Sequence, residues 1–214
     1  MNILKPQRVS INDLKRESIN KLVANKESDE NIQNILFEDE EINQIDLSNI
    51  QFEYCKFNNI NMQNGIIEKV TFKDIVFSNC NFSNTKFIET AFIRCEFNNC
   101  KLAGCDFSEN RLYNVAFIES NANYMNLSLA SIEKVLFKNT ILRNSFFEET
   151  KIRDIYFQEA DLTQAQFFKT SLKNVDLSNS NIQGLAVSIE NIKGAIINEF
   201  QSIDLLYLLG VKLK

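Results

Sequence analysis

Three cysteines, Cys95, Cys100 and Cys105, lie five residues apart in the stretch RCEFNNCKLAGCDF, and evenly spaced thiols could bind a metal ion. Zinc sites usually cluster two of their ligands on one loop, with two to four residues between them. These thiols instead recur as an even series along the chain, which argues against zinc. Cys55 and Cys80 continue the same five-residue register. We expect no metal site and no cofactor, so the spacing must come from the fold.

Residues suited to acid–base or nucleophilic catalysis are scarce. The chain has no histidine, the commonest general base and metal ligand, and no glycine-rich phosphate-binding loop. Neighbouring carboxylates such as Glu148 and Glu149 do occur, but a carboxylate pair needs a concave pocket around it to act on a substrate. We expect no catalytic residues, and a protein that is not an enzyme.

Length, charge and hydropathy restrict the class of protein further. The chain has 214 residues, enough for one domain with a sizeable core, and its net charge of −5 opposes binding to nucleic acid or anionic membranes. No apolar run approaches the ~20 residues of a membrane span. The N-terminal stretch lacks the apolar core of a signal peptide. We expect a cytoplasmic protein with reduced thiols.

The strongest pattern in the sequence is a five-residue repeat. Every fifth residue from Ile32 to Ile197 is apolar, and no insertion breaks the register. Such an internal repeat indicates a solenoid. We call the large apolar residue of each block its centre. The residue two places earlier is small or slender and faces inward too, because residues two apart in an extended segment point the same way. All five cysteines occupy this inner place, where a thiol acts as a small hydrophobe.

Two further features give the shape of the coil. Asparagine and glycine dominate two places after the centre, and both tolerate the backbone conformations that turns require. Phenylalanine occupies the centre at every twentieth residue from Phe37 to Phe157. The sequence therefore predicts four blocks to a coil, each a short strand followed by a corner, and a phenylalanine ladder along one inner wall.

These blocks resemble those of the pentapeptide repeat family. The clearest instances are CNFSN (80–84), CDFSE (105–109), ADLTQ (160–164) and VDLSN (175–179). The resemblance implies an all-β fold, a right-handed quadrilateral β-helix. We assign residues 31–198 to this β-helix, residues 1–30 to an N-terminal cap segment, and residues 199–214 to a C-terminal dimerisation helix and tail.

The C-terminal tail is similar to that of one subfamily, the Qnr-like and MfpA-like proteins that protect topoisomerases. Gln201, Leu205, Leu209 and Gly210 match its pattern of a short helix ending in Leu-Gly before a hydrophobic strand. In that subfamily the tail joins two subunits end to end. The resemblance implies a homodimer, and the tail is unusually apolar for a free chain end. The expected interface residues are Leu205, Leu206, Leu209, Val211 and Leu213.

Residues 1–29 precede the repeat. Ser10 is a candidate N-cap for a helix, and apolar residues follow it at helical spacing. These are Ile11, Leu14, Ile19, Leu22 and Val23. The open end of a solenoid must be covered, so we expect a helix that caps the first coil. A helix that binds a partner is the alternative.

Outward residues separate into four columns of different charge. The basic face, built on Phe52 and its equivalents, includes Lys73, Arg94, Arg111, Lys134, Lys151 and Arg153. The first acidic face, built on the phenylalanine ladder, carries Glu96, Glu119, Glu159 and Asp176. The second acidic face, opposite the first, carries Glu89, Asp106, Glu109 and Glu149. The remaining face is nearly neutral. Charge of one sign along a rod produces an extended potential.

The resemblance implies a function for such a rod. Members of the subfamily mimic B-form DNA, bind DNA gyrase or topoisomerase IV, and protect these enzymes from quinolones, which confers resistance to the antibiotic. Either acidic face could contact the basic groove of the enzyme, and the sequence does not choose between them. Two alternatives remain: a repeat scaffold for another protein partner, and an immunity factor against a gyrase-directed toxin.

Overall fold

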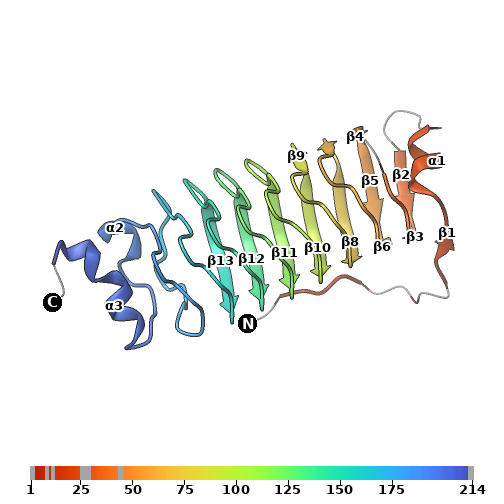
Figure 1. Ribbon diagram of the computed structural model, residues 1–214. Helices are drawn as coiled ribbons and strands as arrows, with labels where there is room; N and C mark the ends of the chain where they lie inside the picture. The colour runs from red at the N-terminus through yellow and green to blue at the C-terminus, as the bar shows by residue number, and fades with distance from the viewer. Residues whose placement is uncertain (1–2, 8–9, 11–12, 25–29, 43–45, 212–214) are drawn as a thin grey trace.

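The computed structural model describes residues 3–211, with gaps at 8–9, 11–12, 25–29 and 43–45. The chain winds into a parallel β-helix that forms a long rod, with the first coils at one end and two short helices at the other (Figure 1). The predicted fold class is confirmed.

The elements are short and follow one another closely along the coils. In chain order they are β1 (Lys15–Arg16), α1 (Ile19–Ala24), β2 (Glu30–Gln33), β3 (Ile35–Glu38), β4 (Asp46–Ser48), β5 (Ile50–Glu53), β6 (Lys56–Asn58), β7 (Ile66–Glu68), β8 (Thr71–Ser78), β9 (Lys86–Ile88), β10 (Ala91–Asn98), β11 (Arg111–Ile118), β12 (Ser131–Lys138), β13 (Lys151–Gln158), α2 (Ile189–Ile192), α3 (Gln201–Leu205) and a 3₁₀ helix (Leu206–Leu209).

Strands of successive coils pair in parallel with an offset of twenty residues. Phe77 of β8 pairs with Phe97 of β10, which pairs with Phe117 of β11. The long strands β8 and β10 to β13 each cross two faces, the basic face and the first acidic face. The second acidic face and the neutral face are held by shorter strands and single bridges, such as that between Asn126 and Phe146. The four-block coil is confirmed by this register.

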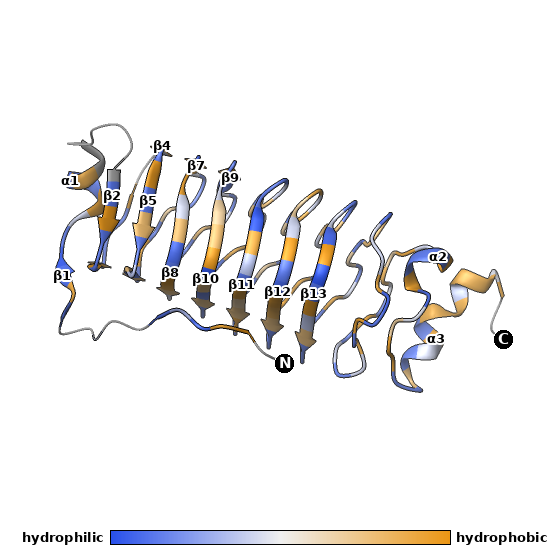
Figure 2. Cartoon of the chain, turned by 180° about the vertical axis from the view of Figure 1, so that it is seen from behind, coloured by the Kyte–Doolittle hydropathy of each residue, from blue (hydrophilic) through white to orange (hydrophobic). Residues whose placement is uncertain are grey.

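The core is a stack of side chains inside the coil. Apolar and polar residues form alternating bands along the strands (Figure 2). Phe97 is fully buried, and its ring stacks on Phe77 at 4.6 Å and on Phe117 at 4.9 Å between centroids. Offset-stacked rings add to the free energy that burial itself provides. The predicted phenylalanine ladder is present.

The small inner residues contribute hydrogen bonds as well as packing. The hydroxyl of Thr85 donates to the carbonyl of Met62 at 2.7 Å, and the thiol of Cys95 donates to the carbonyl of Phe72 at 3.3 Å. Both acceptors belong to the centre 23 residues earlier. A buried donor without a partner costs free energy, so a hydroxyl or thiol is tolerated at this place because the carbonyl accepts its proton. The cysteine spacing is therefore a property of the fold, and all five thiols are buried and free of disulfides.

The corners explain the polar residues of the repeat. Residues two places after the centre adopt left-handed backbone, as in Asn84 and Asn99 with φ of 58° and 51°. The residue just before the centre caps the turn: the Oδ1 of Asn81 accepts from the amide of Ser83 at 3.1 Å. Asp161 does the same for Thr163 at 3.1 Å. Asparagine and aspartate favour these local bonds, which accounts for the CNFSN and ADLTQ blocks.

The N-terminal prediction is wrong in its helix boundaries. Lys15–Arg16 form β1, which pairs with β3 of the first coil. The amide of Lys15 donates a hydrogen bond to the carbonyl of Asn34 at 3.0 Å. The helix begins only at Ile19, because the carboxylate of Glu40 accepts from the amide of Ile19 at 2.9 Å and caps it. Residues 15–16 form a strand instead of a helix because they pair with the open edge of the sheet at the first coil. Ile11 lies outside the described residues.

One coil has an unusual core. Ala122 is the only centre smaller than valine, and Met125 occupies the next inner place, which usually holds a small or slender residue. Both are fully buried. Because methionine adapts to irregular gaps, we expect that Met125 fills the space beside Ala122. Met125→Ala should lower the free energy of unfolding by about 2–5 kcal/mol, more than Ala165→Gly does. Equal urea midpoints for the two variants would contradict this compensation.

Candidate functional site

An N-terminal arm, residues 3–7, covers part of the first acidic face. In Figure 1 it lies along the rod beside the strands from β8 to β11. The amide of Leu4 donates to Oδ1 of Asn114 and that of Gln7 to Oδ1 of Asp74, each at 2.9 Å. Pro6 is buried. The five-residue pattern does not predict this arm; its signal in the sequence is Pro6, the only proline, which favours extended backbone.

One predicted site residue, Glu96, is buried on the side of the rod where the arm lies. Glu96 was expected to point into solvent, but only 6% of it is exposed. Ala116 and Leu136, which occupy the same outward place in the next two coils, are buried as well. We attribute this burial to the arm along that side. The other candidates of the first acidic face, Glu119 and Glu159 among them, are exposed.

Asp176 is the last predicted site residue of the first acidic face, and it too is exposed. Its Oδ1 accepts from the hydroxyl of Ser178 at 2.6 Å and from the amide of Ser178 at 2.9 Å. These two bonds, the hydroxyl bond first, lower the pKa of the Asp176 carboxyl. The carboxylate therefore caps its own turn while it remains open to solvent.

The second acidic face is open to solvent over the middle of the rod. Glu89, Glu109 and Glu149 are exposed in the same corner column, and Asp106 is half-buried. Asp106 accepts from the side-chain amide of Asn126 at 3.1 Å, and Glu149 pairs with Lys169 at 2.6 Å. The carboxylates here remain accessible, so the structure brings this predicted set together on one uncovered surface.

The basic face is partly neutralised by ladders of ion pairs. Lys73 contacts Glu53 at 2.9 Å, and Arg153 contacts Glu133 at 3.2 Å; in each pair the base lies twenty residues after the acid. The same spacing joins Arg94 to Asp74. A twenty-residue offset places two side chains on adjacent coils. The charges of this face follow from the register of the repeat, but their pairing was not predicted.

The C-terminal end exposes an apolar surface. Leu205 and Leu206 are half-buried, whereas Leu209 is 67% and Val211 51% exposed. Leu213 lies outside the described residues. The neighbouring residues Phe200, Ile203 and Tyr207 are exposed too.

Gln201, one of the residues matched in the tail, fixes the first turn of this end. Its side-chain amide donates to the carbonyls of Leu177 and Ser180 at 2.8 and 2.6 Å. These bonds attach α3 to the last complete coil. The exposed apolar residues after it are therefore presented on a fixed support.

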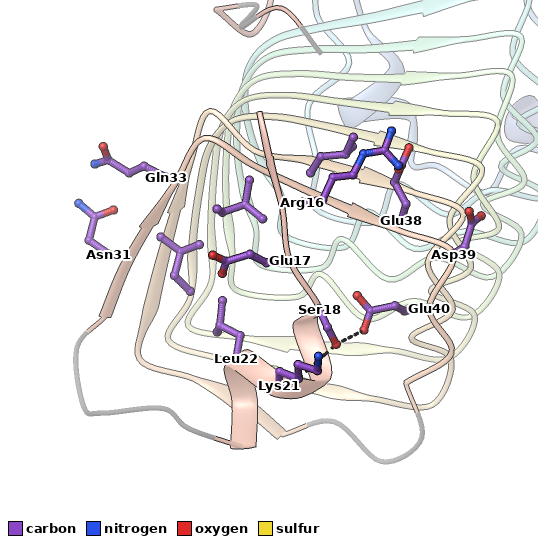
Figure 3. A pocket seen from close by; sticks show the side chains of 13 residues that line it. Arg16, Glu17, Ser18, Lys21, Leu22, Asn31, Gln33, Glu38, Asp39 and Glu40 are labelled. Atoms are coloured by element: carbon purple, nitrogen blue, oxygen red, sulfur yellow. Dashed lines mark hydrogen bonds and ion pairs between the residues drawn. The ribbon is translucent and has the colours of Figure 1, made fainter. Parts of the chain in front are cut away.

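A hollow of about 920 Å³ lies at the N-terminal end of the rod, between α1 and the first coil (Figure 3). Its charged groups are engaged in holding the cap. Arg16 pairs with Glu38 at 2.8 Å, and the hydroxyl of Ser18 donates to Glu40 at 2.8 Å. Leu22, Ile32 and Leu36 line its apolar wall. The arrangement serves the contact between cap and coil.

Three of the buried thiols, those of Cys55, Cys95 and Cys105, are poor nucleophiles. Burial is the main cause that raises the pKa of Cys55 to about 11 and that of Cys95 to about 12. Burial also raises the pKa of Cys105. The thiolate is the reactive form of cysteine, so these side chains stay protonated at neutral pH. In the described part of the chain, no group of three histidine, cysteine or acidic side chains is placed to hold a metal ion.

The raised thiol pKa values predict alkaline destabilisation. Unfolded thiols ionise near pH 9, and the folded ones hold their protons to about 11 or 12. The folded state therefore binds more protons in this range, and stability falls as pH rises from about 9 upward. Urea unfolding at pH 7.5, 9 and 10.5 measures this. A Cys55→Ala/Cys95→Ala variant should show a shallower decline, and an equal slope would contradict the assignment.

None of the helices described is long and apolar enough to cross a membrane.

Comparisons with known proteins agree with the fold. HetL, a pentapeptide repeat protein involved in heterocyst differentiation regulation from the cyanobacterium Nostoc sp. strain PCC 7120, is 15% identical; the match covers 85% of this chain and 95% of HetL, with a TM-score of 0.52. A trypsin-treated variant of QnrB1, a plasmid-mediated fluoroquinolone resistance protein, is 20% identical over 87% of this chain and 92% of QnrB1, with a TM-score of 0.37. No curated protein sequence matches significantly. At these identities the likeness concerns the fold alone.

The family model of the pentapeptide repeat region matches residues 90–167. The five-residue register continues without a break on both sides of this segment, from Ile32 to Ile197. The coil built by that register is one continuous β-helix. Residues 90–167 therefore match the pentapeptide repeat region, and the same register and the same β-helical fold continue on both sides of that segment.

Proposed function

We propose that the protein is a non-enzymatic scaffold that binds a type II topoisomerase, DNA gyrase or topoisomerase IV, through its second acidic face, and protects that enzyme from quinolones in the cytoplasm. The subfamily resemblance of Gln201, Leu205, Leu209 and Gly210 suggests the partner. The observation that carries the proposal is the open set of Glu89, Glu109 and Glu149 in one corner column along the rod, with Leu129 between the last two.

The choice between the two acidic faces rests on the N-terminal arm. A groove that binds DNA must be basic to hold phosphates, so its competitor needs accessible carboxylates along its length. The arm side of the first acidic face has lost Glu96 to burial. The second acidic face keeps its corner carboxylates in solvent. Charge complementarity of this kind weakens as the salt concentration rises.

A symmetric dimer through the C-terminal end is part of the proposal. Leu209, Val211, Phe200 and Ile203 give that end an exposed apolar surface beyond the last coil. Such surfaces mark interfaces, and a two-fold dimer is the commonest closed assembly. Removing residues 200–214 should convert dimers to monomers in analytical ultracentrifugation. A truncated chain that still sediments as a dimer would place the interface elsewhere.

The deciding experiment is a gyrase supercoiling assay with ciprofloxacin, with and without the purified protein. We expect the protein to restore supercoiling, and to bind gyrase more weakly at 300 mM than at 50 mM salt. Replacing Glu89, Glu109 and Glu149 by glutamine should reduce binding and leave the fold intact, because these side chains are exposed. Charge reversal at Lys134 and Lys151 on the basic face should have a much smaller effect.

The same assay separates the alternatives. If both acidic faces can be neutralised without loss of gyrase binding, mimicry of DNA is wrong and a scaffold for another partner is the better account. Binding to gyrase without protection from ciprofloxacin would instead favour an immunity role against a gyrase-directed toxin.

A further inference from the structure

Two corner residues of the second acidic face break the residue pattern of their columns. Tyr124 and Leu129 border the block 125–129 on its two edges and have φ of 60° and 61°. The other described corners in the column of Tyr124 are asparagine, glycine or glutamine. Those in the column of Leu129 are Asn49, Lys69, Glu89, Glu109, Glu149 and Lys169.

The fold gains little from either side chain. Left-handed backbone is unfavourable for bulky residues and is well tolerated by asparagine and glycine. Tyr124 is 59% and Leu129 50% exposed, so burial in the core does not offset the conformational cost at either corner. Residues that hold a strained backbone without structural compensation concentrate at functional sites.

Further apolar and acidic side chains lie next to these corners. The amide of Leu129 donates to the carbonyl of Glu148 at 2.8 Å, and the amide of Glu149 to that of Phe168 at 3.1 Å, so the three segments occupy adjacent coils. Phe168 is 42% exposed, and Glu148 and Glu149 are exposed between it and Leu129. Exposed aromatic and aliphatic side chains that share one face with acidic ones are typical of a protein interface.

We propose that Tyr124, Leu129 and Phe168, here called the apolar corner patch, form the contact centre for the topoisomerase. The inference rests on the proposed function and deepens it. The carboxylates of Glu109, Glu148 and Glu149 around the patch select a partner surface whose apolar pocket is bordered by lysine or arginine. The acidic rim accelerates and orients association; the three apolar side chains determine how long the complex lasts.

The test replaces both corner residues by asparagine, which should raise the stability of the protein and lower its affinity for gyrase. In a Tyr124→Asn/Leu129→Asn variant, asparagine relieves the strained backbone at both corners. We expect its melting temperature to rise by about 2–4 °C while its affinity for purified DNA gyrase, measured by surface plasmon resonance, falls at least about tenfold. Glu119→Asn/Glu159→Asn is the matched control, since both residues are exposed left-handed corners with φ of 51° on the first acidic face. It should gain stability and keep its affinity.

Each other outcome has a definite meaning. If the Tyr124→Asn/Leu129→Asn variant binds gyrase as tightly as the wild type, the apolar corner patch is not the contact centre, while the proposed function stands. If that variant is less stable than the wild type, the two side chains serve the fold and the inference is overturned. If the wild-type protein binds neither gyrase nor topoisomerase IV, the proposed function is wrong, and this inference falls with it.

Discussion

Phe97→Ala is expected to lower the free energy of unfolding by about 3–5 kcal/mol, because it removes a fully buried ring and leaves a cavity that a stacked core cannot close. The ring loses its stacking with Phe77 and Phe117 and its edge contact with Phe107 at 6.2 Å. In a solenoid each coil is supported by its two neighbours, so one missing ring weakens the contacts on both sides.

Urea unfolding followed by circular dichroism measures this loss. Phe168→Ala is the matched control, because it removes the same ring from a side chain that is 42% exposed. The control should cost less than about 1 kcal/mol. A loss at Phe97 as small as that at Phe168 would mean that the coils relax into the cavity.

Asp74→Ala is expected to lower the free energy of unfolding by about 3–5 kcal/mol and to release the N-terminal arm. The Asp74 side chain is fully buried and accepts three bonds: from Nε and Nη2 of Arg94 at 2.7 and 2.5 Å, and from the amide of Gln7 at 2.9 Å. The variant leaves the guanidinium and one arm amide without their acceptor. Breaking a buried pair on one side is costly because the other charge stays behind.

Two measurements separate these effects. Urea unfolding gives the stability, and hydrogen exchange at the amides of Leu4 and Gln7 reports whether the arm has detached. Glu149→Ala is the control, since Glu149 is also a left-handed corner paired with a base twenty residues later, but it is exposed. An exposed pair contributes little. An equal loss of unfolding free energy in the two variants would show that the burial of Asp74 does not strengthen its contribution.

The fold was predictable because the repeat encodes it twice. The inward positions fix the strand direction through the alternation of side chains, and the twenty-residue phenylalanine series fixes the number of blocks in a coil. Asn84 and its equivalents mark the corners. Each of these signals is local and recurs many times, so one unusual residue such as Ala122 does not obscure them.

The candidate site was only partly predictable, because it depends on contacts outside the repeat. The columns of charge follow from the register. The burial of Glu96 does not, since it depends on an arm whose partner Asn114 lies 110 residues away from Leu4. The boundary of α1 likewise depends on Glu40, a residue of the first coil that caps the helix from outside its own segment.

The arm also has a consequence for how the rod unfolds. Coils that touch only their neighbours can fray from either end, one after another. Here the amide of Leu4 bonds Asn114, and β1 of the same segment bonds the first coil. Fraying at the N-terminal end must therefore detach the arm from coils far along the rod, which makes the segment from Lys15 to Asn114 one cooperative unit. During synthesis the arm emerges before the coils that bind it, so it has no complete binding surface until residue 114 has left the ribosome. Among the described residues no such strap reaches the last coils, so native-state hydrogen exchange should show them opening independently.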